Sequence, residues 1–458
     1  MNVYDYVVIG AGSAGCAVAA RLAAASYTVL LIEAGGWDRR ISVWAPLAYG
    51  AQVGGPTDWA FESEPEPGCD GRRIPQPRGK VLGGTSAMNA MVWVRGSRLD
   101  YDGWQLPGWA WDDVEPVFRR IESGPMRVTR VAEPEEVSRR FVIAARSAGE
   151  AANDDVSGPD LDGAAISPVT VWKGQRWSTA RACLDHARGL PNFSLVTGAL
   201  VRRVVIRDGA AVGVEYERRG RSRTATARHE IVLSAGAYGT PQLLQLSGVG
   251  PAEHLRSVGI DPVVDSPRVG HNLTDHPATF MNWDLAAGFI GLADARDPKW
   301  LLRWLIRRTG KLTSNLMEAV AHIRSAPGLP APDFSAHSRA DLRADRRDDV
   351  STAGLVDPAV VLDPCQPRQR DGSVARRGRA AGDPVEHADR RGRRGRVRAG
   401  DPAHPGDRLD RTIGVGRGGG DPPWAGGEDR RRVGGMGPSD GCDDRPSGVF
   451  GGDGHRTG

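Results

Sequence analysis

The first 33 residues of the chain constrain its fold more than any other stretch. The segment YDYVVIGAGSAGCAVAARLAAASYTVLLIE reads as a short apolar strand, a glycine-rich turn, a small-residue helix and a second apolar strand ending at Glu33. Strands buried on both faces and joined through a helix are typical of a parallel sheet in an α/β fold. The sequence therefore predicts a βαβ unit, with its second strand over residues 28–33.

The turn carries the pattern Gly10-x-Gly12-x-x-Gly15. In such a fingerprint the first glycine permits a tight turn, the second lets a pyrophosphate approach the backbone, and the third allows the helix to pack on the strand. The helix N-terminus adds free N–H groups and a partial positive charge. Glu33 stands where a carboxylate can accept hydrogen bonds from ribose hydroxyls. The pattern predicts a dinucleotide site and does not by itself distinguish FAD from NAD.

Two further stretches indicate a second contact region for the cofactor. Residues 79–104 read GKVLGGTSAMNAMVWVRGSRLDYDGW, in which Gly83 and Gly84 allow close backbone approach and Asn89 can donate an amide hydrogen bond to a ring system. Thr85 and Ser86 are interpreted either as a helix N-cap or as flavin contacts. Residues 236–251, GAYGTPQLLQLSGVGP, follow an expected strand over 230–235 and indicate another strand-to-helix turn.

These stretches, in this order, resemble the glucose-methanol-choline (GMC) family of FAD-dependent oxidoreductases. DWAFESEPEPG at 58–68 and VGHNLTDHP at 269–277 also resemble family segments, and the resemblance covers roughly residues 3–337. It implies an α/β (α+β overall) fold with a Rossmann-like FAD-binding domain and a second, mainly antiparallel-sheet substrate domain. It also implies hydride transfer from an alcohol to flavin N5. A plain nicotinamide site is disfavoured because residues 79–104 would have no role in it.

The resemblance further implies which residues contact FAD. They are Gly10, Gly12, Gly15, Glu33, Val81, Gly83, Gly84, Asn89, Ala90, Met91, Val92, Val201 and Ala235, with Tyr238 close by. The expected division of the chain assigns residues 1–120 and 196–275 to the FAD-binding domain and residues 121–195 and 276–337 to the substrate domain.

The composition changes from about residue 338 to 458. Arg, Gly and Asp become abundant, Lys, Asn and Tyr are absent, and large apolar residues are too sparse to form a core. Three interpretations fit such a composition: out-of-frame translation of a GC-rich gene, a natural disordered tail, and a nucleic-acid-binding tail. The scarcity of aromatics, with Trp424 and Phe450 as the only two, and the balance of Asp against Arg argue against the last. We favour a frameshift, and expect this part to be disordered.

The family's catalytic histidine, in a C-terminal H-P-x-G-T segment, has no counterpart in the sequence. His404-Pro405-Gly406 lacks the threonine and lies in the unusual tail, so no catalytic residue is assigned. His276 is expected in a local turn with Asn272 and Asp275. His322 is expected on a helix near the substrate, with a core or surface position as the alternative.

Several classes of partner and site are not expected. The net charge of +4 is too small for a dedicated nucleic-acid binder, and no apolar run is long enough to span a membrane. The stretch 300–306 reads as an amphipathic helix. The five cysteines are far apart, with Cys16 expected in the core, so neither a disulfide framework nor a metal site is expected. These features suggest a cytoplasmic protein.

The sequence thus leads to an FAD-dependent oxidoreductase acting on CH–OH groups of a small alcohol, either choline-like or another primary alcohol, with an undetermined electron acceptor. It is expected to be inactive as written, because the base is missing. The alternative is a non-catalytic flavin-binding or interaction protein with a remodelled tail.

Overall fold

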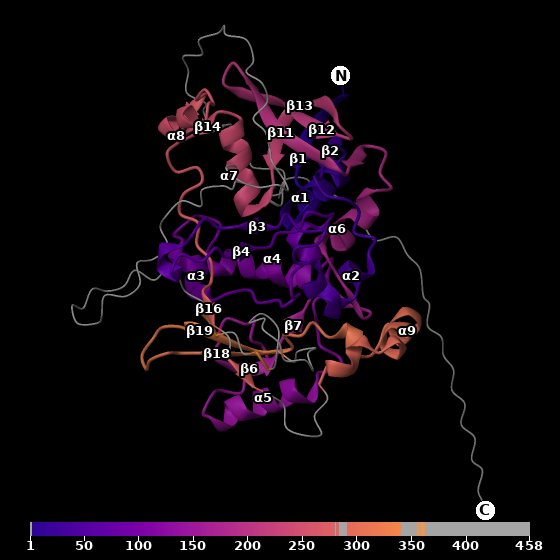
Figure 1. Cartoon of the computed structure of the whole chain (residues 1–458), viewed down its shortest axis with the longest axis vertical. Coiled ribbons are helices and arrows are strands. Elements are labelled where there is room, and N and C mark those ends of the chain that lie inside the picture. Colours follow the sequence, from indigo (N-terminus) through magenta and orange to yellow (C-terminus); the bar gives the residue numbers. More distant parts are fainter. Residues whose placement is uncertain (1, 280, 284–290, 340–354, 357–358, 362–458) are drawn as a thin grey trace, which may run out of the picture. The chain divides into compact units, whose positions relative to one another are not determined.

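The computed structural model describes residues 2–279, 281–283, 291–339, 355–356 and 359–361. A six-stranded sheet forms the first layer of this part of the chain (Figure 1). In spatial order its strands are β10 (Phe193–Val196), β2 (Val29–Ile32), β1 (Asn2–Ile9), β13 (Arg221–Leu233), β12 (Ala210–Arg218) and β11 (Ala199–Arg207). The first four strands are parallel, and β11, β12 and β13 form an antiparallel meander.

Successive residues of β1 point to opposite faces of this sheet, as strand geometry requires. Val8 packs with buried residues of α1 (Ser13–Ala24) and α6 (Thr179–Ala187). Val7, its neighbour, packs on the other face with Leu243 of α7 (Gly236–Leu246). Figure 1 accordingly shows α1 and α7 on different sides of the sheet, and both faces are closed by apolar contacts.

A second, antiparallel sheet has five strands. Their spatial order is β16 (Ala278–Thr279), β21 (Ala359–Val361), β19 (Phe334–Ser338), β18 (Ala319–Ile323) and β6 (Gly163–Ile166). Helix α5 (Glu136–Ser147) packs on one face, where Val142 contacts Ala164, Ala319 and Ala321. A parallel-stranded layer and an antiparallel one are therefore both present, which confirms the predicted fold class.

The remaining elements are short and connect or flank the two sheets. The other helices are α2 (Ile41–Trp44), α3 (Arg98–Gly103), α4 (Trp111–Ser123), α8 (Ala252–Ser257) and α9 (Pro298–Arg307), with 3-10 turns η1 (Pro46–Gln52), η2 (Pro67–Cys69), η3 (Gly84–Ala87), η4 (Ala293–Arg296) and η5 (Lys311–Thr313). The two-stranded ribbons are β3 (Phe61–Glu62) with β4 (Pro75–Gln76), β5 (Thr129–Arg130) with β7 (Pro168–Val169), β8 (Val171–Trp172) with β9 (Gln175–Arg176), β14 (Val249–Gly250) with β15 (Val264–Asp265), and β17 (Asn282–Trp283) with β20 (Leu355–Val356).

The predicted local elements occur close to their expected positions. The strand expected over 28–33 is β2. The strand expected over 230–235 corresponds to the last part of β13, which ends at Leu233, and the amphipathic segment 300–306 lies in α9. Of the range 338–458, the structure describes Ser338, Arg339 and the short strands β20 and β21, so the predicted disordered tail, His404, Cys365 and Cys442 lie outside the described residues. Among the helices that are described, none has the length and apolar character needed to cross a bilayer.

The helix expected around His322 is wrong. His322 lies in strand β18, between β6 and β19, and pairs with Gly163 on one side and Ser335 on the other. The stretch NLMEAVAHI is rich in residues that favour helices. Pairing with strands distant in sequence overrides that local preference. His276, by contrast, lies in an irregular segment in which its N–H donates to the Asp275 carboxylate at 2.9 Å.

Candidate functional site

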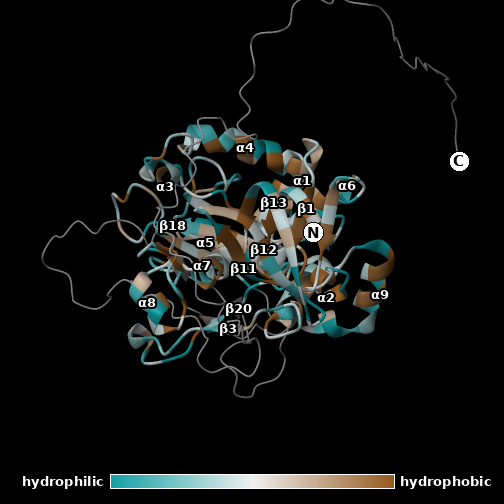
Figure 2. Ribbon diagram, turned by 90° about the horizontal axis from the view of Figure 1, so that it is seen from above, coloured by the Kyte–Doolittle hydropathy of each residue, from teal (hydrophilic) through white to brown (hydrophobic). Residues whose placement is uncertain are grey.

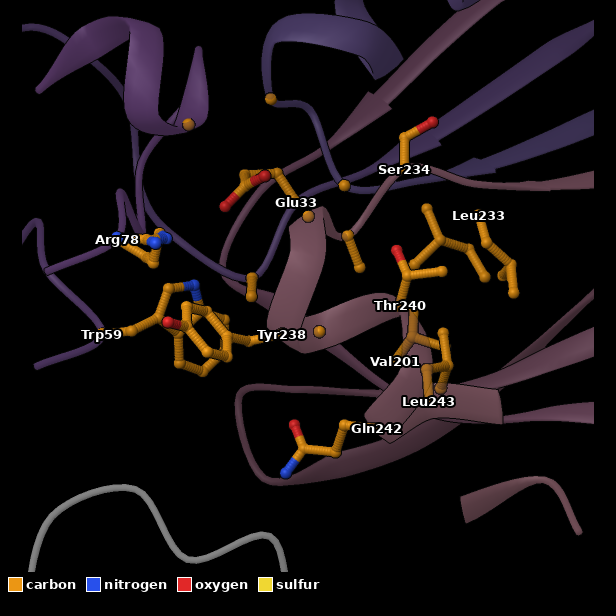
Figure 3. Close-up of a pocket in the computed structure, with 18 of the residues that line it drawn as sticks. Glu33, Trp59, Arg78, Val201, Leu233, Ser234, Tyr238, Thr240, Gln242 and Leu243 are labelled. Carbon is orange, nitrogen blue, oxygen red and sulfur yellow. The ribbon is translucent and has the colours of Figure 1, made fainter. Parts of the chain in front are cut away.

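A cavity of about 560 Å³ lies where β1, β2, β11 and β13 meet the start of α1 and the body of α7. Six of the thirteen predicted cofactor residues line it, namely Gly10, Gly12, Glu33, Gly84, Val201 and Ala235. In Figure 3, Glu33 lies between Arg78 and Trp59 on one side and Val201 and Leu243 on the other. Segments far apart in the sequence therefore form one elongated site beside the glycine turn.

The glycine turn is packed so tightly that two of its positions exclude a side chain. A Cβ atom on Gly10, whose φ is +91°, would overlap the carbonyl oxygen of Ser234, and one on Gly15 would overlap the carbonyl oxygen of Gly10. Gly12 differs, since the nearest atom to a Cβ built there is the Gly84 Cα at 3.9 Å. Its missing side chain leaves room beside the cavity, which fits a backbone that a phosphate approaches closely.

Helix α1 begins at this same turn, and its first residues Ser13 and Ala14 line the cavity. Its N-cap is Gly12, no side chain accepts a hydrogen bond from the first turn, and that turn holds no acidic residue. The N–H groups and the positive end of the helix dipole are thus not neutralised by a local carboxylate. Together with the space at Gly12, this makes the turn suited to an anion.

Glu33 lies just beyond β2 and is only 5% exposed. Its two carboxylate oxygens accept hydrogen bonds from the N–H groups of Ala11 and Gly35, each at 2.8 Å. Burial raises the pKa of Glu33 to about 7, although these two hydrogen bonds act in the opposite direction. Each oxygen keeps further acceptor capacity, so the fixed carboxylate can receive hydroxyl donors from the cavity side.

Arg78 is the one cation among the described residues that line the cavity, and no motif in the sequence indicated it. Its guanidinium lies 4.8 Å from the centre of the Tyr238 ring and donates to the Pro77 carbonyl oxygen at 2.8 Å. Tyr238 is itself held by a hydrogen bond from its hydroxyl to Gln76 at 2.9 Å. The cavity thus combines one buried carboxylate with one positioned guanidinium.

Aromatic residues extend the wall next to Arg78. The rings of Trp59 and Phe61 stack with their centres 5.6 Å apart, and Phe61 lies 5.7 Å from Tyr238. Trp59 and Phe61 come from the stretch 58–68, which the sequence had related to a family segment without giving it a role. Both line the cavity and supply an apolar surface at this side of it, where Figure 3 shows Trp59 beside Tyr238.

The other seven predicted residues do not line the cavity. Gly15 and Val81 are buried structural positions, and Gly83 donates its N–H to the Ala11 carbonyl oxygen at 2.8 Å. The remaining four, Asn89, Ala90, Met91 and Val92, run toward the antiparallel sheet. There the Ala90 carbonyl oxygen accepts from Asn315 at 2.8 Å, and Val92 forms a β-bridge with Val169.

Thr85 and Ser86 lie in η3, but neither caps it. The Thr85 hydroxyl accepts from the Gly79 N–H at 3.2 Å, and Thr85 lines the cavity. The Ser86 hydroxyl accepts at 3.0 Å from the N–H of Thr179, the first residue of α6, whose N-cap is Ser178. Neither Thr85 nor Ser86 is therefore a helix N-cap, although Ser86 binds a free N–H at the start of α6.

Arg176 is a second residue that sequence reasoning missed. It is 1% exposed and donates to the Val43 carbonyl oxygen at 3.0 Å and to the Asn89 side-chain oxygen at 2.9 Å. Burial without an acidic partner lowers the pKa of this guanidinium to about 9. Arg176 thereby fixes Asn89, so the amide of Asn89 is oriented by a buried cation.

Candidate bases and metal ligands are sparse near the cavity. Within the described ranges no histidine lines it, and no cluster of three or more His, Cys, Asp or Glu side chains could hold a metal ion. Cys16 is buried in the apolar cluster on the α1 face of the sheet, and its thiol donates to the Ala11 carbonyl oxygen at 3.2 Å. It has a packing role there.

Comparisons with known proteins agree with this arrangement. The family model described as GMC oxidoreductase matches residues 4–278. An uncharacterized GMC-type oxidoreductase of Mycobacterium bovis is 43% identical over 350 residues, 72% of this chain and 66% of the relative. An oxygen-dependent choline dehydrogenase of Sinorhizobium fredii is 39% identical over 361 residues, 73% of this chain and 64% of the relative. The matched part therefore spans just under two thirds of each relative.

Solved structures are similar as well. A crystal structure of formate oxidase has a TM-score of 0.71 and 25% identity, covering 79% of this chain and 73% of the other. Pyridoxine 4-oxidase from Mesorbium loti has a TM-score of 0.67 and 27% identity, covering 78% and 70%.

Proposed function

The chain belongs to the GMC oxidoreductase family, whose members bind FAD, and from that premise we propose that its 560 Å³ cavity holds the ADP half of FAD in an alcohol oxidoreductase. One observation carries the proposal: the helix N-terminus at Gly12, the Glu33 carboxylate and the Arg78 guanidinium all meet at one elongated cavity. These are the groups that a diphosphate and a ribose require.

Different residues of the cavity would bind the diphosphate, the ribose and the adenine. The N–H groups at the start of α1 and the Arg78 guanidinium would bind the diphosphate, because both are positive, the first turn of α1 holds no acidic residue and Arg78 forms no ion pair among the described residues. Glu33 would accept hydrogen bonds from the ribose hydroxyls, and Val201 would meet the adenine through its backbone. The space at Gly12 and the spare acceptor capacity of Glu33 both support this fit.

The residues 83–92 would continue the site toward the flavin ring. When bound, the flavin supplies a hydride acceptor for the CH–OH carbon of the substrate. Asn89, held by Arg176, would orient the ring by a hydrogen bond, and Ala90, Met91 and Val92 would keep this part of the backbone in place through their links to Asn315, Thr170 and Val169. The proposed substrate is a small alcohol, choline-like or another primary alcohol.

Alcohol oxidation also needs a base for the hydroxyl proton. No histidine of the described residues lines the cavity, and the sequence has no H-P-x-G-T segment. We therefore expect no measurable turnover. The missing base, rather than the cofactor cavity, would limit the chain.

The test separates cofactor choice from turnover. Titration of the purified chain with FAD, ADP, FMN and NAD⁺ is expected to show that FAD and ADP compete for one site while FMN does not. Tighter binding of NAD⁺ than of FAD would overturn the cofactor assignment. Anaerobic addition of choline or other primary alcohols is expected to leave the flavin oxidised, and alcohol-dependent bleaching would overturn the proposed inactivity.

A further inference from the structure

Helix α9 (Pro298–Arg307) is anchored to the rest of the chain on one side only. Trp304 is fully buried, and its indole N–H donates to the Gly174 carbonyl oxygen at 2.7 Å. Trp300, one turn earlier, is half-buried and donates to the Asp294 carboxylate at 3.2 Å. These two indoles, four residues apart, define the inner side of the helix.

The opposite side of α9 carries four large aliphatic residues. Their side chains are exposed by 38% at Leu301, 58% at Leu302, 44% at Leu305 and 70% at Ile306. The pairs 301/305 and 302/306 are four residues apart, so the four residues form one continuous strip, which we call the α9 apolar face. Figure 2 shows the alternation of hydrophobic and hydrophilic residues along this helix.

Cations surround the α9 apolar face. Residues 291–313 contain six Lys or Arg and only two acids, Asp294 and Asp297. The two acids pair with Lys311 and Lys299, respectively. Arg303, Arg307 and Arg308 have no carboxylate partner within the described ranges: Arg303 donates to the Thr309 hydroxyl at 3.1 Å, and Arg308 lies 4.2 Å from the Trp304 ring.

From this geometry we propose that the α9 apolar face docks on an anionic lipid surface. An exposed aliphatic strip flanked by arginines is what a helix lying in the plane of a bilayer interface requires, with apolar side chains entering the acyl boundary and cations meeting the headgroups. Glu133, Glu135 and Glu136 share a pocket with Arg303 but form no ion pair with it among the described residues, so the charge of Arg307 and Arg308 selects the occupant. In a two-fold contact the same arginines would face one another across the interface, whereas an anionic surface neutralises them.

The proposal does not depend on flavin binding and goes beyond the proposed oxidoreductase activity. Docking would place the protein at a membrane through one short helix that lies in the interface and does not cross the bilayer. Both parts of the surface are needed, because aliphatic burial and electrostatic attraction to anionic headgroups add to the binding strength. Removing either part should therefore weaken the association.

The test is co-sedimentation of the full chain with lipid vesicles. We expect the protein to bind phosphatidylcholine vesicles that contain phosphatidylserine, to bind pure phosphatidylcholine vesicles far less, and to dissociate at high salt. The double variant Leu302→Asp/Ile306→Asp should lower the partition coefficient about tenfold or more. The double variant Arg303→Gln/Arg307→Gln should weaken binding and reduce its salt dependence.

Matched controls keep the result specific to α9. Ile143→Asp changes an equally exposed aliphatic residue on α5, and Arg219→Gln/Arg221→Gln removes two exposed charges from the β12–β13 hairpin. All variants share the rest of the chain, including residues 340–458, so a difference between them reports on the helix. Melting curves verify that each variant is folded.

Equal binding of the α9 variants and the controls would overturn the proposal. So would a failure of the wild-type chain to bind anionic vesicles. A dimer that dissociates on Leu302→Asp/Ile306→Asp, without vesicle binding, would show instead that a second copy covers the α9 apolar face.

Discussion

Gly84 lies so close to Gly12 that a Cβ atom on Gly84 would come within 2.7 Å of the Gly12 Cα. The two glycines belong to stretches seventy residues apart in the sequence, the dinucleotide fingerprint and the GKVLGGTSAMN segment. Their contact brings the 78–85 loop onto the glycine turn and completes the cavity there. The atoms nearest to such a Cβ belong to the backbone of Gly12. A rotamer change therefore cannot make room for a side chain at position 84, and the backbone itself would have to shift.

The variant Gly84→Ala is therefore expected to lower the free energy of unfolding and to weaken FAD and ADP binding. Gly54→Ala is the matched control: Gly54 also has a positive φ, +70°, but a Cβ there has no atom within 4 Å. Both variants bear the left-handed backbone penalty of about 1–2 kcal/mol. The overlap should add about 1–3 kcal/mol at Gly84 alone. Urea unfolding measures this difference, and equal values for the two variants would contradict it.

The variant Glu33→Gln is expected to change both the pH dependence of the free energy of unfolding and the affinity for FAD. The pKa of Glu33 is about 7 when folded and 4.5 in its ordinary state, so the folded protein holds the proton more tightly. The associated stability is present below pH 4.5 and is lost as the pH rises to 7. The neutral glutamine lacks this titration, so relative to the wild type the variant should gain up to about 3 kcal/mol as the pH rises from 5 to 8. A pH-independent cost of about 1–3 kcal/mol is set against it, because the N–H group of Ala11 or of Gly35 loses its acceptor.

Affinity should change in the opposite direction. Glutamine has one acceptor oxygen where Glu33 has two, and Ala11 and Gly35 already donate to them. Fewer acceptors would remain for ribose hydroxyls, so binding of FAD and of adenosine should weaken about tenfold. Urea unfolding at pH 5 and 8, combined with ligand titration, measures both effects. A variant that binds adenosine as tightly as the wild type would remove Glu33 from the ribose site.

The sequence was most informative where structure is local. The strand, turn, helix and strand through Glu33 follow from apolar runs and glycine spacing within 33 residues, whereas the elements that pack on them, α6, α7 and β13, come from distant parts of the chain. The same pattern led directly to Gly10, Gly12 and Glu33 in the cavity lining. Val201 and Ala235, which come from distant strands, could be named only through the family resemblance.

Features that depend on contacts between distant parts of the chain could not be predicted from the sequence. The segment around His322 has a helix-favouring composition, but its place in the sheet depends on β6, more than 150 residues earlier. Arg78 and Arg176 belong to no motif. The first reaches the cavity because Tyr238 of α7 lies against it, and the second is buried because Val43, Ser86 and Asn89 converge on it.

Arg78→Gln tests whether this guanidinium contacts the diphosphate. We expect affinity for FAD and ADP to fall about tenfold while affinity for adenosine stays unchanged, because the lost interaction is with charged oxygens. The salt dependence of ADP binding should fall as well. Arg72→Gln, which changes an exposed arginine on the other side of β4, serves as the control. Equal losses for ADP and adenosine would point to a collapsed cavity wall around Tyr238.

Two buried histidines make the antiparallel sheet sensitive to acid. His322 on β18 is paired directly opposite Ser335 on β19, so these two side chains lie on the same face of the sheet. His337 is two residues after Ser335 on the same strand, so it lies on that face as well. They are 1% and 9% exposed, and the Ser335 hydroxyl lies 2.8 Å from His337 Nε2. Burial lowers the pKa of each imidazole to about 4, with Asp162 opposing this at His322 and the neighbouring His322 adding to it at His337.

Because both pKa values are below the ordinary 6.5, the unfolded chain binds protons that the folded chain does not over the range from pH 6.5 to 4. Stability should therefore fall as the pH drops through this range, by about 2 kcal/mol per histidine at pH 5. The variant His322→Gln/His337→Gln lacks both groups and should lose this part of the slope. Urea unfolding at half-unit pH steps measures it, with exposed His254→Gln as the control. A double variant that keeps the wild-type slope between pH 5 and 6.5 would assign the acid sensitivity to carboxylates, since the neutral side chains can no longer take up a proton.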